Sequence, residues 1–137
     1  MGRKQAREGT MKLLFQMSST NDYSDEARDI YLTNFEFDEL ETNYIMDAIQ
    51  TINENLDEID KNIIAHLEGW SINRLAKVDL AVLRLAIYEI VYRKDIPLEV
   101  SINEAIETVK KYSSEDSFKF INGVLGGFVR SINKKDD

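Results

Sequence analysis

Apolar residues recur along this chain at the three- and four-residue spacing of amphipathic helices. Between residues 3 and 19, small or apolar side chains occupy Ala6, Thr10, Leu13, Leu14 and Met17, which predicts a helix with one buried face. The chain holds one proline, and three of its six glycines fall between residues 123 and 127, so signals for strands and turns are scarce. The pattern therefore predicts an all-α fold.

Polar residues that commonly begin helices stand before the next apolar runs. Ser24 precedes two acids, where the helix dipole favours negative charge, and this predicts a short second helix. Asp38 precedes a third helix, and a fourth is expected from about Leu56 to Leu67, ended by Gly69. The first half of the chain is thus expected to hold four helices.

The most apolar segment covers residues 70–93. It predicts a short helical turn at 72–77 and then a helix over 79–93 that is apolar nearly all round, as buried helices are. Arg84 and Glu89 lie on this helix. Because an unpaired buried charge is costly, we expect both to be held in structural ion pairs or hydrogen bonds.

Two more helix starts are predicted in the last third of the chain. Ser101 and Glu104 have the S-x-x-E spacing of a capping box. Ser114, followed by two acids, predicts the start of a last helix. The core stripe of that helix is Phe118, Ile121, Leu125, Phe128 and Ile132. About seven helices are expected in all.

Charge is distributed unevenly along the sequence. The first twelve residues hold four bases and one acid, although the whole chain has a formal net charge of -8. Residues 22–60 hold thirteen acids and one base, and residues 61–137 hold eleven acids and twelve bases. We interpret the acidic half as a solvated face that keeps nucleic acid away from it.

The residues of common catalytic and metal chemistry are sparse. The chain has no cysteine, which excludes disulfides, thiolate metal sites and a cysteine nucleophile, and favours the cytoplasm as its compartment. His66 is the only histidine, and no glycine-rich phosphate loop follows a strand. We therefore expect no catalytic residue, no metal site and no cofactor. The apolar runs are too short or too interrupted by charge to suggest a membrane segment.

The first helix carries residues that a single buried face does not explain. Lys4, Arg7, Met11 and Phe15 fall on a second stripe when each residue turns the helix by about 100°. This stripe is expected to meet a partner. The alternative is that Met11 and Phe15 pack under another helix of the same domain and that the basic residues are a solvated start.

The last helix raises a similar question. Lys119, Gly123 and Gly126 lie opposite its core stripe, with Phe120 and Gly127 beside them. Each glycine inside a helix costs about 1 kcal/mol relative to alanine, which is tolerable where a neighbouring helix or a ligand approaches closely. An exposed aromatic ring beside a lysine can also stack an unpaired base.

Three ordered motifs, VLRLAIYE, IPLEVSINEAIE and KFINGVL, and the N-terminal run QAREGTMKLLFQ resemble the N-utilization substance B (NusB) family over nearly the whole chain. The resemblance implies an all-helical fold of two small bundles in a single RNA-binding domain, with subdomains at about 1–69 and 70–137. It implies a transcription antitermination factor that binds the boxA element of nascent ribosomal RNA leader transcripts. The factor binds as a heterodimer with a small ribosomal protein, NusE, within the transcription elongation complex.

The resemblance also assigns site residues. The RNA-facing positions that match the family are Arg3, Lys4, Arg7, Asp116, Lys119, Phe120 and Asn122. The partner-facing positions are Phe15 and Asp79. Gln5 and Ala6 interrupt the arginine cluster that some members have, so weak RNA binding by the isolated protein is expected, with dependence on the partner. The basic front end is then interpreted as a local positive edge for RNA phosphates.

Two alternatives remain open at this stage. The chain is also compatible with a protein-interaction domain that acts as a homodimer without direct RNA binding. Similar helical domains occur fused to ribosomal RNA methyltransferases as well, but this sequence has no strand pattern and no methyl-donor glycine loop.

Overall fold

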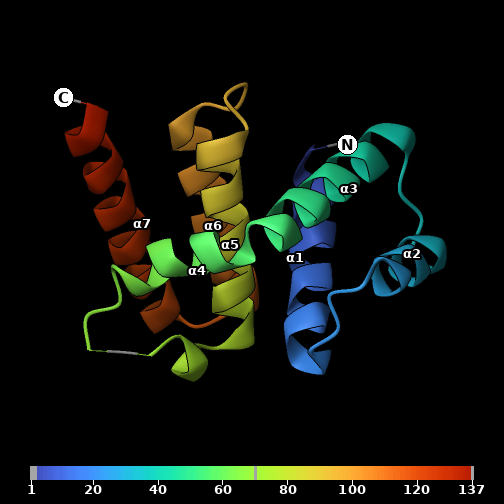
Figure 1. Ribbon diagram of the computed structural model, residues 1–137, viewed down its shortest axis with the longest axis horizontal. Coiled ribbons are helices and arrows are strands. Elements are labelled where there is room, and N and C mark those ends of the chain that lie inside the picture. The colour runs from blue at the N-terminus through green and yellow to red at the C-terminus, as the bar shows by residue number, and fades with distance from the viewer. Residues whose placement is uncertain (1–2, 70, 137) are drawn as a thin grey trace.

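The computed structural model describes residues 3–69 and 71–136. Figure 1 shows the arrangement of its helices. They are α1 Arg3–Thr20, α2 Asp25–Asn34, α3 Glu39–Glu54, α4 Leu56–Ile64, α5 Lys77–Tyr92, α6 Leu98–Tyr112 and α7 Glu115–Asp136, with a short 3₁₀ turn at Ile72–Arg74. No described residue lies in a strand, so the prediction of an all-α fold with about seven helices is confirmed.

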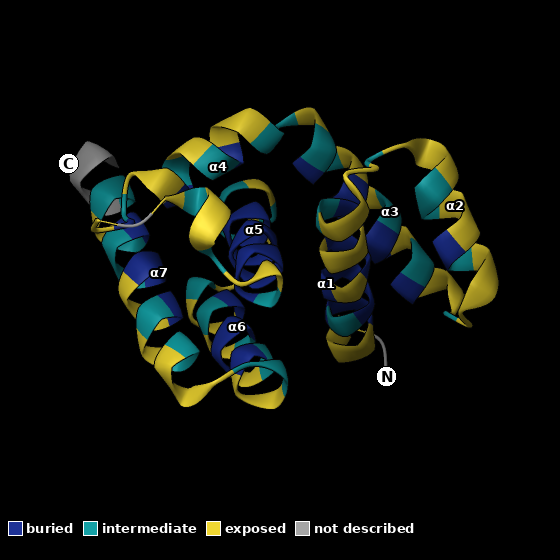
Figure 2. Cartoon of the chain, turned by 90° about the horizontal axis from the view of Figure 1, so that it is seen from below, coloured by how far each residue is buried: buried dark blue, intermediate teal, exposed yellow. Residues whose placement is uncertain are grey.

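Helix α5 is the centre of the molecule. Every residue from 79 to 89 is buried, because α1 and α6 pack against this helix and α3, α4 and α7 also touch it. Helix α3 packs on α1, α7 packs on α6, and α4 passes from the α3 side to the α7 side (Figure 1). Figure 2 shows that α1, α5 and α6 turn their buried faces inward.

One continuous apolar core joins these helices. Its fully buried members include Leu13 of α1, Ile45 of α3, Leu83 and Ile87 of α5, and Ile121 of α7. Burying each such side chain contributes about 1.5–3 kcal/mol relative to leaving it in water. The subdomain boundary near residue 69 stays a prediction, and the core extends across it.

Several predicted helix starts are confirmed. The Ser24 hydroxyl accepts a hydrogen bond from the backbone N–H of Ala27, which makes Ser24 the N-cap of α2. Asp38 and Glu41 form a full capping box at α3. The Ser114 hydroxyl accepts from the backbone N–H of residue 117 at the start of α7. Local sequence therefore determines where these helices begin.

The predicted capping box at Ser101 and Glu104 is wrong. Helix α6 begins at Leu98, with Pro97 before it, so both residues lie inside the helix. Pro97 favours this earlier start because a proline has no N–H to leave unpaired. The side chain of Ser101 then donates to Glu89 and that of Glu104 accepts from Arg7, so tertiary contacts use the groups that a cap would have used.

Helix α4 is also shorter than expected. It ends at Ile64 instead of near Leu67. The backbone N–H groups of His66 and Leu67 donate three residues back, to Ile63 and Ile64, in the tighter 3₁₀ manner. This tightening places Leu67 in the core, and Gly69 follows with a φ of 75°, which favours glycine.

The carboxylate of Glu89 lies within the core and is 2% exposed. Arg7 Nε donates to its Oε2 at 2.7 Å and Arg7 Nη2 to its Oε1 at 3.2 Å. Ser101 Oγ donates to Oε1 at 2.8 Å, and the Tyr44 hydroxyl donates to Oε2. Helices α1, α3, α5 and α6 therefore meet at one buried charge.

The protonation states of the donors fit this arrangement. Burial works to lower the pKa of Arg7, but the hydrogen bond and the charge of Glu89 overcome it, so the pKa is raised and the guanidinium stays charged. Burial, with the negative charge of Glu89, raises the pKa of Tyr44 far above its ordinary value. Tyr44 therefore stays protonated and donates a hydrogen bond to Glu89.

The second charge on α5, Arg84, is paired as predicted. Its Nε and Nη2 donate to the two carboxylate oxygens of Asp60 on α4, at 2.9 and 2.8 Å. Its Nη1 also donates to the hydroxyl of Tyr23 at 3.2 Å. Arg84 thus joins α4 and the segment before α2 to α5, which confirms the expectation of a structural ion pair.

We predict that Glu89→Gln lowers the free energy of unfolding by about 3–5 kcal/mol, the usual cost of removing one partner from a buried ion pair. The physical reason is that the Arg7 guanidinium stays buried without its counter-charge. Urea unfolding monitored by circular dichroism measures the effect. The control is Glu68→Gln, a change at an exposed acid, which should shift stability by less than about 0.5 kcal/mol. Equal stability of Glu89→Gln and the control would contradict the assigned role.

Candidate nucleic-acid interface

Helix α1 presents its first residues to solvent. Arg3 and Lys4 are exposed, and the Arg3 guanidinium lies over the ring of Tyr44 at 5.4 Å from its centroid. These two side chains form the positive edge expected at the start of the chain. Both are free to meet an anion from solvent, as phosphate contacts require.

Arg7 does not belong to this edge. The residue is 8% exposed, its guanidinium is bound to Glu89, and its Nη1 also lies 3.3 Å from Glu104 Oε1. Its charge is neutralised inside the fold, so the prediction that Arg7 faces RNA phosphates conflicts with its position. The sequence holds one indication that Arg7 is buried. Glu89 lies on a helix that is predicted to be buried, and a buried carboxylate needs a counter-charge from another helix.

The second stripe predicted on α1 is only partly on the surface. Lys4 and Phe15 are exposed, whereas Arg7 and Met11 are buried, Met11 at 2%. Helix α1 packs against both α3 and α5, so its buried face is wider than one helical stripe. For Met11 the alternative of packing within the domain is correct.

The first two turns of α7 hold the other predicted RNA-facing residues. Asp116, Lys119 and Asn122 are exposed, and the Phe120 ring is half-buried against the core. A half-buried ring keeps one part fixed by packing and leaves another part open to a base. The structure brings these four residues together on one helix.

The α7 group and the start of α1 lie apart. Both views show α6 and α5 between α7 and α1 (Figures 1 and 2). The structure thus gives two separate regions instead of one continuous patch made of the predicted residues. A nucleic-acid strand that touches both regions has to pass over the helices between them.

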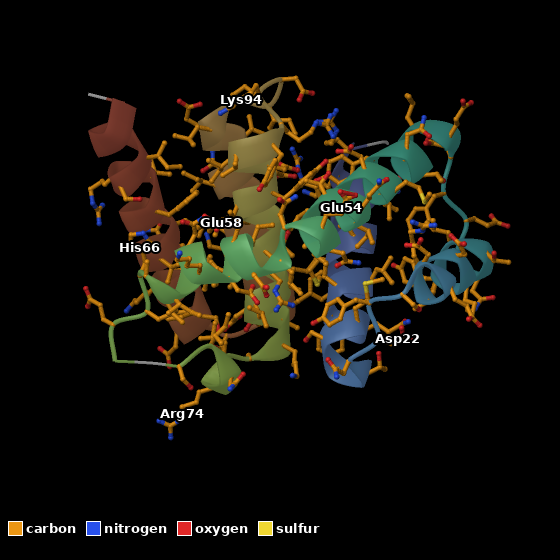
Figure 3. The ribbon with its side chains drawn as sticks, in the orientation of Figure 1. Asp22, Glu54, Glu58, His66, Arg74 and Lys94 are labelled. Carbon is orange, nitrogen blue, oxygen red and sulfur yellow. The ribbon has the colours of Figure 1, made fainter. Side chains whose placement is uncertain are left out.

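The glycines of α7 differ in what surrounds them. A Cβ at Gly127 would lie 3.0 Å from Nδ1 of His66, which Figure 3 shows beside α7. A Cβ at Gly123 would meet nothing within 4 Å, and one at Gly126 would meet only the Arg130 side chain, at 3.4 Å. Close packing with His66, in the turn after α4, therefore explains Gly127, and Gly123 faces open space.

The two predicted partner-facing residues have different positions. Phe15 is 40% exposed on the outer side of α1 and is available for contact. Asp79 is 5% exposed, and its carboxylate accepts hydrogen bonds from Ser113 Oγ at 3.0 Å and Ser117 Oγ at 2.8 Å. The expectation that Asp79 itself touches a partner conflicts with this burial. It ties the start of α5 to the turn between α6 and α7.

One group of side chains was not predicted from the sequence, and it lies where α1, α6 and α7 approach one another. Lys12 and Lys111 each lie over the Tyr112 ring, and Lys110 lies over the Phe118 ring. The pair of lysines at the end of α6 fits an ordinary helix terminus, where positive charge is favourable. Because this local explanation is sufficient, the sequence gives no sign that Lys110 and Lys111 take part in contacts with other helices.

Other kinds of site find no support in the described part of the chain. No group of histidine, cysteine and acidic residues among these residues could hold a metal ion. The described helices are also too short or too polar to cross a membrane. Lysines and aromatic rings are thus the chemically distinctive surface groups of α1, α6 and α7.

Comparison with known proteins gives consistent matches over nearly the full length. The sequence profile of the NusB family matches residues 4–130. The transcription antitermination protein NusB of Acetivibrio thermocellus is 45% identical over 130 residues, which cover 95% of this chain and 90% of the relative. The protein of that name from Clostridium acetobutylicum is 41% identical, with 98% of this chain and 100% of the relative covered.

Solved structures give the same result. The structure of T. maritima NusB matches with a TM-score of 0.86 at 40% identity, covering 95% of this chain and 93% of that chain. A chain in the crystal structure of antitermination factors NusB and NusE in complex with dsRNA matches with a TM-score of 0.83 at 27% identity. That match covers 94% of this chain and 96% of the other.

We predict that Gly123→Ala raises the free energy of unfolding by up to about 1 kcal/mol, because alanine favours a helix and its Cβ enters open space. Gly127→Ala is the matched comparison and should gain less, since the His66 ring has to move. Thermal or urea unfolding of both variants measures the difference. A larger gain at Gly127 would contradict the packing described for α4 and α7.

Proposed function

Because this chain belongs to the NusB family, we propose that it is a transcription antitermination factor that binds boxA RNA of nascent ribosomal RNA leaders. It does so as a heterodimer with NusE, within the transcription elongation complex. The match to NusB proteins over nearly the whole length of both chains carries this proposal. The 27% identical chain in a crystal structure with NusE and dsRNA adds the kinds of partner.

The role calls for binding surfaces rather than for catalysis. It requires no cofactor and no catalytic residue, and we assign the protein to the cytoplasm, where transcription complexes assemble. The whole chain acts as one RNA-binding domain, with helical subdomains at about 1–69 and 70–137. Both subdomains contribute to the RNA surface in this proposal, since α1 and α7 each hold part of it.

The proposed RNA surface consists of Arg3 and Lys4 on α1 and of Asp116, Lys119, Phe120 and Asn122 on α7. The exposed side chains of Arg3, Lys4 and Lys119 neutralise phosphates, which accounts for the salt-dependent part of RNA binding. Phe120 offers a ring for an unpaired base. Arg7 is left out of this surface, because its guanidinium is held by Glu89 and Glu104. Its part is to hold α1 so that Lys4 stays on the outside.

The proposed partner surface centres on Phe15. A partly exposed aromatic side chain on a rigid helix is a common anchor in protein interfaces. The acidic half of the chain, with thirteen acids between residues 22 and 60, attracts a basic ribosomal protein and repels RNA. Asp79 is buried and supports the partner surface only indirectly. Its carboxylate accepts hydrogen bonds from Ser113 and Ser117 and so fixes the turn between α6 and α7.

The direct test is binding of labelled boxA-like single-stranded RNA, with and without NusE, against a scrambled RNA of equal length. Preferential binding of the boxA-like strand, strengthened by NusE, is the expected result, because two weak surfaces joined in one complex gain from effective concentration. Failure to distinguish the two strands in the presence of NusE would contradict the proposal. If the protein then sediments as a dimer, the homodimer alternative takes its place.

We predict that Phe120→Ala weakens binding of boxA-like RNA by about 1–3 kcal/mol, the usual range for losing a base stacked on an aromatic ring. The slope of log affinity against log salt should stay nearly unchanged, because no charge is lost. Fluorescence anisotropy at several salt concentrations, with NusE present, measures both quantities. Normal binding by the variant would identify Phe120 as a packing residue only.

We predict that Phe15→Ala weakens the complex with NusE while leaving the helical circular dichroism unchanged, because the ring is 40% exposed and contributes little to the core. Isothermal titration calorimetry measures the affinity. The matched control is Phe35→Ala, which removes another exposed phenylalanine, 54% exposed at the end of α2. An equal effect of the two changes would argue against a specific role for Phe15.

A further inference from the structure

Lysine and aromatic side chains gather where the end of α6 meets α1 and the start of α7. The Nζ atoms of Lys111 and Lys12 lie 5.2 and 5.4 Å from the centroid of the Tyr112 ring. Lys110 Nζ lies 4.9 Å from the centroid of the Phe118 ring. We call these five residues the lysine–aromatic corner. Three helices contribute to it, so no single stretch of sequence contains it.

The lysines of the corner are accessible, and the rings beneath them are fixed. Lys12 and Lys110 are exposed, and 60% of the Lys111 side chain is exposed. Tyr112 and Phe118 are half-buried and pack against the core. A lysine held over a fixed ring has already lost part of its conformational freedom. An anion that binds such lysines therefore meets charges that are partly positioned in advance.

One acid occupies part of the corner. Glu8 of α1 accepts hydrogen bonds from Lys111 Nζ at 2.8 Å and from the Tyr112 hydroxyl at 2.5 Å. The bonds from Lys111 and Tyr112 lower the pKa of Glu8, and the bond to Glu8 raises the pKa of Lys111. At neutral pH both groups are charged. Any anion that approaches Lys111 has to compete with the Glu8 carboxylate.

The corner lies between the two parts of the proposed RNA surface. Lys12 is two turns along α1 from Lys4, and Phe118 stands next to Lys119 on α7. In Figure 2, α6 lies between α7 and α1, and the last residues of α6 are Lys110, Lys111 and Tyr112. A single strand that contacts both α7 and α1 would cross these lysines.

We propose that the lysine–aromatic corner binds the phosphodiester backbone of single-stranded RNA, and that Glu8 limits this binding by holding Lys111 until a phosphate replaces the carboxylate. This inference rests on the proposed function and adds to it a phosphate contact and a competing acid. Phosphate is the ligand class because the corner offers three ammonium groups, two of them beside the same ring, with no base-reading pattern. Glu8 makes the proposal testable, because removing an acid that competes directly for Lys111 should strengthen RNA binding more than removing an acid elsewhere on the surface.

The experiment uses the full chain with NusE and labelled boxA-like single-stranded RNA, followed by anisotropy over a range of salt. Lys12→Gln and Lys111→Gln should each weaken binding and reduce the log–log salt slope by roughly 0.7, the value for one lost phosphate contact on a single strand. The matched control is Lys94→Gln, which removes an exposed lysine from the α5–α6 turn (Figure 3). It should leave the slope unchanged.

The acid is tested in the opposite direction. Glu8→Gln should strengthen RNA binding about 2- to 5-fold, since a surface ion pair that competes with phosphate is removed. The control is Glu54→Gln, the same charge change at an exposed acid at the end of α3 (Figure 3), and it should change affinity less. Thermal unfolding of each variant verifies that the fold is intact.

The outcomes separate the two proposals. If the unaltered protein with NusE fails to bind the RNA, the proposed function is wrong. If it binds and the lysine variants match Lys94→Gln, the strand does not use the corner and this inference is overturned. Weaker binding by Glu8→Gln, or an effect equal to that of Glu54→Gln, would also overturn the role assigned to Glu8.

Discussion

The buried carboxylate of Glu89 is the interaction on which the arrangement of the helices depends. A carboxylate removed from water is costly unless hydrogen-bond donors surround it, and here they come from Arg7, Tyr44 and Ser101. Each donor belongs to a different helix, so the charge can be satisfied only when α1, α3 and α6 all pack against α5. Apolar packing alone would tolerate rotation of α1. The geometry of the guanidinium does not, since its two nitrogens have to face Glu89.

This constraint also decides what α1 shows to the outside. With Arg7 turned inward, Lys4, Lys12 and Phe15 take the outer positions of the helix. The chain thus has less positive surface at its start than the sequence suggests, because one of the four early bases neutralises a buried acid. At the end of α6, Lys111 lies beside α1, paired with Glu8, and Lys110 lies over Phe118 of α7. Of the strongly acidic α2–α4 segment, α2 lies on the other side of α1 in Figure 1, whereas α3 crosses α1 and α4 reaches α5 and α7.

Smaller polar contacts hold other elements against α5. Asp79 holds Ser113 and Ser117 at the turn from α6 to α7, and Arg84 holds Asp60 on α4. The first of these contacts fixes the turn between α6 and α7 relative to α5. Binding groups on rigid helices lose little freedom when a ligand arrives, so surface lysines and rings can act together there.

The sequence by itself determined the fold class and most helix starts, because helix periodicity and N-caps depend on residues within one or two turns. Ser24, Asp38 and Ser114 act as caps where the pattern predicted them. The resemblance to the NusB family likewise came from ordered motifs. Periodicity also predicted correctly that the charges on the central helix are paired, since burial of that helix follows from its composition.

Only the tertiary structure decided which partner each polar group has. Ser101 and Glu104 match a capping box in sequence, yet they bind Glu89 and Arg7, because Pro97 starts the helix earlier and α1 brings a guanidinium to the same place. The predicted surface roles of Arg7 and Asp79 conflict with their burial, because each side chain has a hydrogen-bond partner on another helix. The lysine–aromatic corner joins residues about one hundred positions apart, and such contacts follow from how helices pack rather than from local spacing.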